Sequence, residues 1–195
     1  MGVAGGYCAG KNAVVELLRE CGYQEIDVDR VGHEVLELPE VRRSLAGLFG
    51  PEILAASGAV DRRALGRRVF SSRGELRRLE QVVHPLMVQR VGERIRATSG
   101  PVVINAAILF RMDLQRMCDL VMCVRAGLLR RLRRAWRRDR CGPLSALRRI
   151  LSQRGICPKS RLAGVDTYYV GNNGTLAALR ARVLAVVRQK GIGTR

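Results

Sequence analysis

The sequence lacks any long uninterrupted apolar run. Nowhere in its 195 residues is there a stretch near the roughly 18 apolar residues that a membrane-spanning helix requires. Its amino-terminal residues also lack the basic segment and hydrophobic segment of a secretory signal. We therefore expect a cytoplasmic protein without a membrane-spanning helix.

Metal-binding patterns and aromatic residues are also scarce. The six cysteines include no CxxC pair, and the two histidines do not lie at zinc-ligand spacing from them. We expect these cysteines to be reduced and mostly structural. Three Phe, four Tyr and one Trp provide few surfaces on which single-stranded nucleic acid could stack. This scarcity disfavours single-stranded nucleic acid as a partner.

Acidic residues are few relative to basic ones. The chain has 35 Lys and Arg against 17 Asp and Glu, for a formal net charge of +18, which attracts polyanions of any kind. Nearly all of the excess is Arg, so genome composition explains it as readily as function does. A basic nucleic-acid-binding protein is one alternative, although the charge alone does not identify a partner.

Short apolar runs alternate with segments of helical spacing. Strands are expected at residues 2–4, 23–28, 102–104, 120–124 and 166–170. Helices are expected at residues 13–21, 74–98, 128–140, 143–154 and 175–189. This alternation predicts an α/β fold with a parallel sheet of about five strands flanked by helices, and a mainly helical insertion between the second and third strands. Ligands of such sheets bind at the carboxyl ends of the strands.

A glycine-rich run precedes the first helix. Residues 5–12 have the spacing G-x-x-x-x-G-K, in which backbone amides turn toward a phosphate and Lys11 reaches its oxygens. The positive end of the following helix adds to the attraction. A glycine-rich turn without a ligand is the alternative. Only three residues follow Met1 before this run, fewer than the five or six of a usual strand, so we expect the true start to lie upstream.

Asn12 stands where this pattern usually has Ser or Thr as a magnesium ligand. An amide oxygen is a hard neutral ligand, so we expect Mg²⁺ binding at Asn12 to be weakened but not lost. Asp27 and Asp29 follow the second strand, and in an extended backbone their side chains point to opposite sides. Either carboxylate could accept a proton from a hydroxyl nucleophile, whereas Asp29 as a helix amino-terminal cap is the alternative.

Arginines crowd the expected helix at 128–140. Residues three and four apart share a helix face, so one anion could be bound by Arg130, Arg134, Arg137 and Arg138. A solvated basic face is the alternative. His84 precedes Pro85 inside the long helical stretch, where it is either a ligand-binding side chain or a satisfied core histidine.

Several blocks in the same order resemble the dephospho-coenzyme A kinase family over nearly the whole chain. The phosphate loop is followed by Asp27-Val28-Asp29 at the spacing of the family. The later matching blocks are residues 49–54, 58–62, 68–70, 79–86, Arg134, Arg138-Asp139, Gln153 and residues 170–174.

The resemblance implies a P-loop NTPase fold of the nucleotide-kinase type in one domain, with its core at residues 1–30 and 100–195. It also implies a substrate-binding insertion at about 31–99 and a lid at about 136–160. Such an enzyme transfers the γ-phosphate of ATP, with Mg²⁺, to the ribose 3′-hydroxyl of dephospho-coenzyme A in the last step of coenzyme A synthesis. A monomer or weak oligomer is expected.

The resemblance also implies residue roles. Asp29 is the expected base, Lys11 binds the γ-phosphate and Arg138 is a lid arginine. Asp29, His84 and Arg62 are expected to bind dephospho-coenzyme A. The expected ATP contacts are Gly6, Tyr7, Cys8, Ala9, Gly10, Lys11, Asn12, Ala13, Arg138 and Asn172.

The chain departs from the family pattern at four positions. Cys8 replaces a loop glycine and Asn12 a hydroxyl residue, while Ala107 and Arg111 replace the proline and the acid that usually follow the third core strand. These changes put the catalytic rate in question more than the fold. Another small-molecule kinase is the second enzymatic alternative, because the phosphate loop does not select the acceptor.

Overall fold

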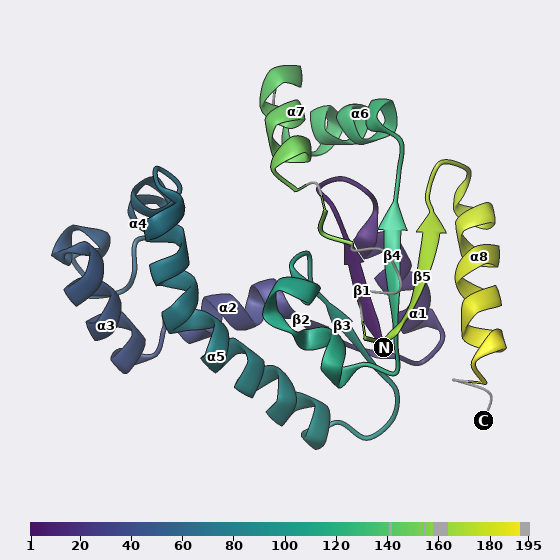
Figure 1. Ribbon diagram of the computed structural model, residues 1–195, viewed down its shortest axis with the longest axis horizontal. Coiled ribbons are helices and arrows are strands. Elements are labelled where there is room, and N and C mark those ends of the chain that lie inside the picture. The colour runs from purple at the N-terminus through teal and green to yellow at the C-terminus, as the bar shows by residue number, and fades with distance from the viewer. Residues whose placement is uncertain (141, 154, 158–163, 192–195) are drawn as a thin grey trace. The chain divides into compact units, whose positions relative to one another are not determined.

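The computed structural model describes residues 1–140, 142–153, 155–157 and 164–191 (Figure 1). The chain divides into two compact units, Met1–Asp27 with Ile95–Arg195, and Val28–Arg94. Residues 141, 154 and 158–160 of the predicted lid lie outside the described residues.

The first unit is built on a parallel sheet. Among the described residues, five strands lie in the order β2-β3-β1-β4-β5, with every neighbouring pair parallel. Their bounds are β1 Gly2–Gly5, β2 Gln24–Asp27, β3 Val102–Asn105, β4 Leu120–Arg125 and β5 Asp166–Gly171. The α/β fold and the parallel sheet predicted from the sequence are confirmed. Because all strands run the same way, the loop after β1 lies at the same edge of the sheet as the ends of β3 and β4.

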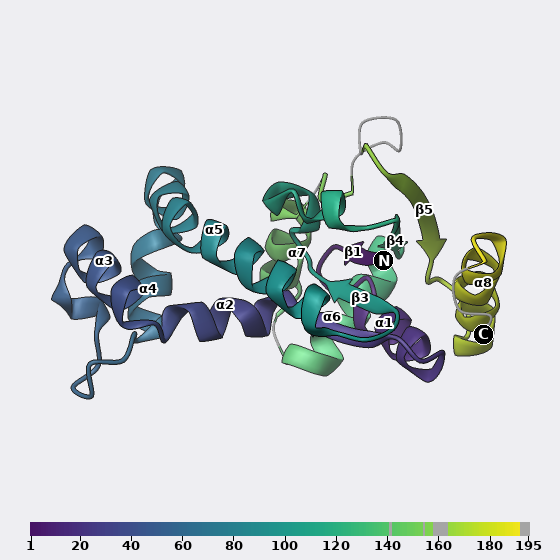
Figure 2. The same cartoon turned by 90° about the horizontal axis from the view of Figure 1, so that it is seen from below.

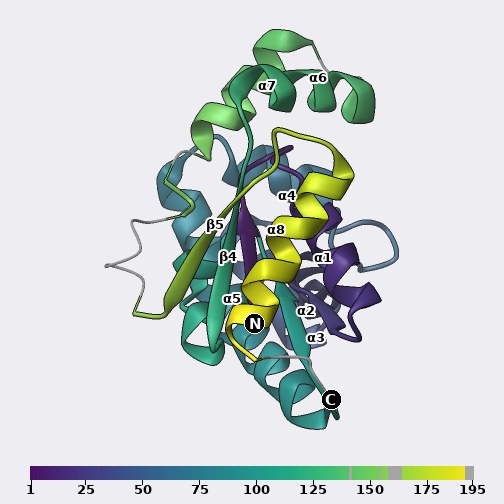
Figure 3. The same ribbon diagram turned by 90° about the vertical axis from the view of Figure 1, so that its right-hand side faces the viewer.

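Helices α1 (Lys11–Glu20) and α8 (Leu176–Gln189) contact each other, and Figure 3 shows α8 across β4 and β5. Their buried side chains form one apolar cluster with alternate residues of the strands. The members from these elements include Val14, Leu18, Leu179, Val183, Val3, Val103, Leu120 and Met122. Burial of this cluster is the main stabilising contribution on this face. It fixes α1, and therefore its first residue, against the sheet.

Two short 3₁₀ helices, η2 (Leu109–Met112) and η3 (Leu114–Met117), follow β3. Leu109 and Leu114 are fully buried. A Cβ atom on Gly2 would lie 2.8 Å from Leu109 Cδ1. The central strand β1 is therefore rich in small residues because its neighbours approach it closely.

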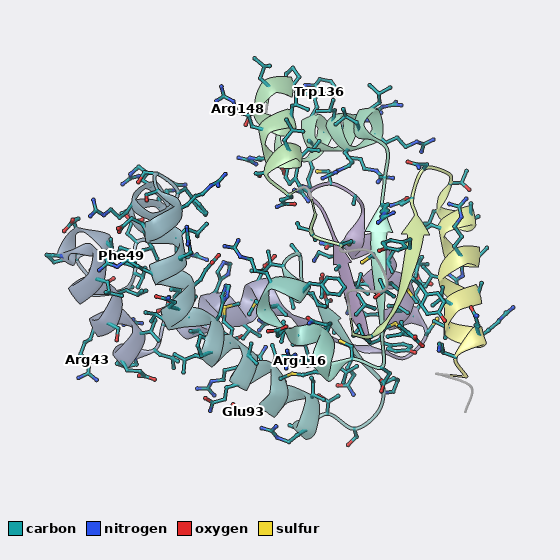
Figure 4. The ribbon with its side chains drawn as sticks, in the orientation of Figure 1. Arg43, Phe49, Glu93, Arg116, Trp136 and Arg148 are labelled. Atoms are coloured by element: carbon teal, nitrogen blue, oxygen red, sulfur yellow. The ribbon has the colours of Figure 1, made fainter. Side chains whose placement is uncertain are left out.

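Helices α6 (Leu128–Asp139) and α7 (Pro143–Ser152) follow β4 and pack against each other. Ala135 of α6 and Ala146 of α7 form a small buried cluster with Cys8. Figure 4 shows Trp136 and Arg148 on the outer sides of these helices. The apolar inner sides therefore pack against the loop that follows β1, while the outer sides are open to solvent.

The second unit is mainly helical. Its elements are α2 (Val28–Leu36), α3 (Pro39–Phe49), the 3₁₀ helix η1 (Pro51–Ile53), α4 (Arg62–Val69) and most of α5 (Arg73–Ala97), as Figure 2 shows. Helix α5 continues through Pro85. Asp61 caps α4, because its carboxylate accepts hydrogen bonds from Arg63 N and Ala64 N at 2.8 and 3.1 Å. These bonds lower the pKa of Asp61. The helical stretch predicted from the sequence is confirmed.

The five cysteines that the structure describes form no disulfide, whereas Cys141 lies outside the described residues. Across the described ranges, no helix is both long enough and apolar enough to cross a membrane.

Candidate functional site

The loop between β1 and α1 has the conformation of a phosphate-binding turn. Gly5 ends β1 and Lys11 begins α1. Between them, Gly10 has a φ of 95°, which a glycine adopts without strain. The turn is closed by bonds from Ala9 N to Gly6 O at 2.9 Å and from Ala13 N to Gly10 O at 3.1 Å. The loop therefore enters α1 at its electropositive end.

Cys8 also lies in the left-handed region, with a φ of 57°. This conformation is strained for a residue with a Cβ atom, so packing must hold it in place. Cys8 is 8% exposed and contacts the buried cluster of α6 and α7. Burial raises the pKa of its thiol. Cys8 is therefore a packing residue and not a reactive thiolate.

Asn172 lies directly beside the loop. It follows β5 and is 6% exposed. Its Nδ2 donates to Ala9 O at 3.0 Å, and its side-chain amide occupies the space where a Cβ of Gly10 would lie. Glycine is thus required at position 10 both by its φ and by the approach of Asn172. This contact joins the end of β5 to the loop.

Two arginines of α6 bind the carbonyl oxygens of the loop. Arg131 Nε donates to Tyr7 O at 2.8 Å, and Arg134 Nη1 donates to Ala9 O at 3.0 Å. Arg134 Nη2 also donates to Asn172 O at 3.1 Å. Because these carbonyls are bound by cations, the loop is held in one orientation from outside. The sequence analysis had grouped Arg134 with the arginines that could bind an anion, but it had not singled out Arg131.

Arg131 has an unused donor at this loop. Its Nη2 atom is buried and has no hydrogen-bond partner in the described part of the structure. A Cβ on Gly6 would lie 2.7 Å from that atom, so glycine leaves room for the guanidinium group. Burial lowers the pKa of Arg131, although an arginine stays charged at any physiological pH. A buried N–H group without a partner beside a glycine loop can donate a hydrogen bond to an anionic oxygen of a ligand.

Tyr7, Arg138 and Asp139 form a second polar cluster against the loop. Arg138 donates to Asp139 through Nε at 2.8 Å and through Nη2 at 3.1 Å, and the Tyr7 hydroxyl donates to the same carboxylate. These bonds, first from Arg138 and then from Tyr7, lower the pKa of Asp139 to about 2. Tyr7 N donates to Gln153 Oε1 after α7. Gln153 and Asp139 thus lie close to the loop.

The basic face of α6 differs in one residue from the predicted set. A hollow of about 300 Å³ is lined by Arg130, Arg133, Arg134 and Arg137. These residues repeat at three and four positions and share one helix face. Arg138 does not line this hollow, because it turns to Asp139, and its guanidinium carbon lies 5.2 Å from the centroid of the Tyr7 ring.

Lys11 is the first residue of α1, and its Nζ donates to Asn105 Oδ1. Asn105 ends β3, is 3% exposed and donates from Nδ2 to Glu25 Oε1 at 2.6 Å. Sequence reasoning missed Asn105 and Glu25. A polar residue that ends a buried apolar strand is the signal that could have indicated Asn105.

Asn12 is exposed in the first turn of α1. Its amide oxygen is of the hard, neutral kind that a cation such as Mg²⁺ accepts as a ligand. Among the described residues, no group of three or more His, Cys, Asp and Glu side chains is arranged to hold a metal ion.

The other candidate residues belong to the second unit. Asp29 is exposed in the first turn of α2, so the expectation of an extended backbone through Asp29 was wrong, because α2 already begins at Val28. For the same reason Asp29 does not precede the helix as a cap. His84 is half-buried on α5, and Arg62 is exposed as the first residue of α4.

Ala107 and Arg111 lie in the segment after β3. Ala107 is half-buried, whereas Arg111 is exposed within η2. The neighbouring Ala106 N donates to Val3 O at 3.2 Å, which continues the pairing of β3 with β1. The loss of a proline and an acid at these positions thus leaves the sheet pairing intact.

Comparisons with known proteins agree with this geometry. The family model described as dephospho-CoA kinase matches residues 1–178. The dephospho-CoA kinase of Geobacillus kaustophilus is 31% identical over 194 residues, which cover 97% of this chain and 95% of the relative. The dephospho-CoA kinase of Bacillus licheniformis is 30% identical over 189 residues, which cover 94% of this chain and 92% of the relative.

Solved structures agree as well. The crystal structure of TT1252 from Thermus thermophilus matches with a TM-score of 0.79 and 31% identity, and the match covers 96% of this chain and 95% of that one.

Proposed function

The chain belongs to the dephospho-CoA kinase family, and on that basis we propose how its residues carry out the reaction. The protein is an enzyme of coenzyme A synthesis that phosphorylates dephospho-coenzyme A with ATP. In our proposal the acceptor is the ribose 3′-hydroxyl and the donor is the γ-phosphate. The observation that carries the assignment of the ATP site is the glycine turn at the entrance of α1, with Lys11 as its first helical residue.

We assign the triphosphate to residues 6–13. Their amides and the helix amino terminus bind phosphate oxygens, and Lys11 neutralises charge on the β- and γ-phosphates. The unpartnered Nη2 of Arg131 supports an anion at this place. Mg²⁺, held by Asn12 and the phosphates, would neutralise developing charge on the transferred group. Magnesium is expected to bind more weakly here than beside a serine or threonine.

We assign the adenine end of ATP to Asn172 and its surroundings. Asn172 is buried between the loop and Arg134, so it links the triphosphate turn to α6. Arg138 is assigned to the transferred phosphate, for which it must leave Asp139. The basic hollow on α6 supports a cationic lid, which we place at about residues 136–160.

We assign the acceptor to the helical insertion at about residues 31–99. Asp29 is the proposed base, since an exposed carboxylate in a first helical turn can accept the proton of a hydroxyl group. His84 and Arg62 are proposed to bind dephospho-coenzyme A, Arg62 through its phosphates. The free cysteines support the reducing cytoplasm as the compartment. We expect a monomer or weak oligomer, which light scattering after gel filtration can test.

A direct assay tests the assignment. Purified protein is incubated with ATP, Mg²⁺ and dephospho-coenzyme A, and the product is separated by chromatography and analysed by ³¹P NMR. We expect coenzyme A with the new phosphate on the 3′-oxygen. A parallel screen of nucleosides and pantetheine derivatives tests for another acceptor. Folded protein that binds ATP but forms no coenzyme A would contradict the proposal.

A further inference from the structure

Two arginines of α6 contact the loop between β1 and α1, and they use their donors differently. Both terminal nitrogens of Arg134 are occupied, since Nη1 donates to Ala9 O at 3.0 Å and Nη2 donates to Asn172 Oδ1 at 3.1 Å. Arg131 donates from Nε to Tyr7 O at 2.8 Å, whereas its buried Nη2 has no hydrogen-bond partner in the described part of the chain. Arg134 therefore has the contacts of a structural residue, while Arg131 has a terminal nitrogen available for a ligand.

The charge of Arg131 also lacks a counter-ion. Among the described residues, no carboxylate forms an ion pair with Arg131, whereas Arg138 of the same helix is paired with Asp139. Arg131 is half-buried, and an arginine stays charged at any physiological pH. A buried N–H group without a partner and a half-buried charge without a counter-ion both lower the stability of the ligand-free protein. An anion that binds beside Nη2 removes both costs.

Gly6 provides the space in which this nitrogen lies. A Cβ atom at position 6 would lie 2.7 Å from Arg131 Nη2, which is closer than real Cβ atoms approach a neighbour. The φ of Gly6 lies outside the left-handed region, so the backbone conformation does not require glycine there. Glycine at position 6 is therefore explained by the guanidinium group and not by the turn.

We propose that Arg131 binds an oxygen of the triphosphate directly through Nη2, while its Nε bond holds Tyr7 O in place. The inference rests on the ATP site proposed above and adds one residue to it. Arg131 lies beside Gly6 at the strand end of the loop, whereas Lys11 lies at the helix end. A triphosphate along the loop therefore has a cation at each end. A charge-assisted bond from arginine to a phosphate oxygen is stronger than a neutral hydrogen bond.

The first test is the substitution Arg131→Met, which removes the guanidinium group but keeps an unbranched side chain. Its affinity for the β,γ-imido analogue of ATP is measured by titration calorimetry. We expect a loss of about tenfold or more, as for the removal of a hydrogen bond between charged groups. Unchanged affinity would overturn the proposal.

Inorganic tripolyphosphate shows whether the lost contact is to phosphate. It has neither base nor ribose, and its affinity is measured by competition with the analogue, so that binding to other basic surfaces is not counted. Arg131→Met should weaken tripolyphosphate by the same factor as the analogue. A loss confined to the analogue would show that Arg131 acts on the nucleoside, and would contradict the proposal.

The matched control is Arg180→Met. Arg180 of α8 forms an exposed ion pair with Glu20, which ends α1 at the opposite end from the loop. This variant removes the same charge from the same unit, and salt screens an exposed charge at such a distance. We expect both affinities to stay within about twofold of the unmodified protein. An equal loss in the two variants would show that only net charge matters, against a direct contact.

Gly6→Ala tests the contact without removing the arginine. The added methyl group occupies the space beside Nη2, so the flexible guanidinium group has to turn away. We expect tripolyphosphate to bind more weakly to this variant. Combining Gly6→Ala with Arg131→Met should add little to the loss from Arg131→Met alone, because the contact is already absent. Fully additive losses would show that the two residues act independently, and would overturn the proposal.

One measurement uses the unmodified protein. A crystal structure with the analogue bound should place a phosphate oxygen within about 3.2 Å of Arg131 Nη2. A filled loop with no phosphate oxygen at that nitrogen would overturn the inference and leave Arg131 as a support for Tyr7 O alone. These readouts do not use dephospho-coenzyme A. If Arg131 binds phosphate but no coenzyme A forms, the proposed function fails alone. If coenzyme A forms and Arg131→Met binds the analogue normally, only the inference fails.

Discussion

The two units of the chain hold their candidate residues in different ways. In the first unit, the loop and Lys11 are held by buried and half-buried partners, among them Asn172, Arg134 and Asn105. In the second unit, Asp29 and Arg62 are exposed at the beginnings of helices. A loop that is already fixed before binding can bind the nucleotide, which is a ligand common to many kinases, without rearrangement. Exposed residues on separate helices suit an acceptor that has to be enclosed.

Substitutions in the two units should therefore have different effects on stability and activity. A residue of the first unit contributes to both folding and nucleotide binding, because its bonds exist without the ligand. A residue such as Asp29 should affect turnover with little effect on stability. Four substitutions test this contrast.

Lys11→Ala removes the cation at the phosphate turn. We expect turnover to fall by about a thousandfold, since preorganised charges at the transferred group contribute on this scale. The assay for coenzyme A formation described above measures the loss. Lys190→Ala, which removes an ion pair with Asp166 on the surface, is the control and should keep normal turnover. Equal effects of the two variants would remove Lys11 from the mechanism.

Asp29→Asn removes the proposed base. The expected loss in kcat is at least about a hundredfold, which is typical of general base catalysis. Affinity for the ATP analogue and the thermal midpoint should both stay normal, because the carboxylate is exposed. If the variant also loses stability, Asp29 stabilises its unit as the loop residues stabilise theirs, and the contrast between the two units is wrong.

Asn172→Ala removes the buried side-chain amide that bonds to Ala9 O and to Arg134. We expect a loss of about 1–3 kcal/mol in the free energy of unfolding, together with weaker ATP binding. Urea unfolding gives the first quantity and calorimetry the second. Asn173→Ala, which removes an exposed bond to Gly127 N, is the matched control and should cost less.

Asp139→Asn tests the cluster around Tyr7. The pKa of Asp139 is lowered to about 2, so its contribution to stability is present above its unfolded pKa near 3.8 and is lost as the pH falls through about 2. The variant should therefore melt slightly below the unmodified protein at pH 7, and the gap should close toward pH 2. A gap that is independent of pH would contradict the ion pair. Asp113→Asn provides an exposed control.

Much of this contrast could be predicted from the sequence, and the reasons are local. Continuous apolar runs precede Asn105 and Arg125 and indicate two buried strands. The glycine spacing before Lys11 indicates the turn. Periodicity alone could not show that Val28 starts a helix directly after β2. The extended backbone expected for Asp29 was wrong for this reason.

Partners from distant segments could not be predicted in the same way. Which arginines of α6 face the loop depends on the rotation of the helix about its axis, and this is set by the packing of Ala135 and Ala146 on Cys8. Arg131 was missed because the sequence does not specify that rotation. Asn105 was missed because its partners Lys11 and Glu25 are about 80 or more residues away in the chain.

The carbonyl contacts of Arg131 and Arg134 have a consequence for how this loop can evolve. Loop conformation is usually encoded by glycines within the loop itself, but here part of it is imposed by a helix more than 120 residues later. A side chain can then replace a glycine at Cys8 while the backbone keeps its left-handed turn. Drift in the loop should therefore be accompanied by retention of these two arginines in related chains.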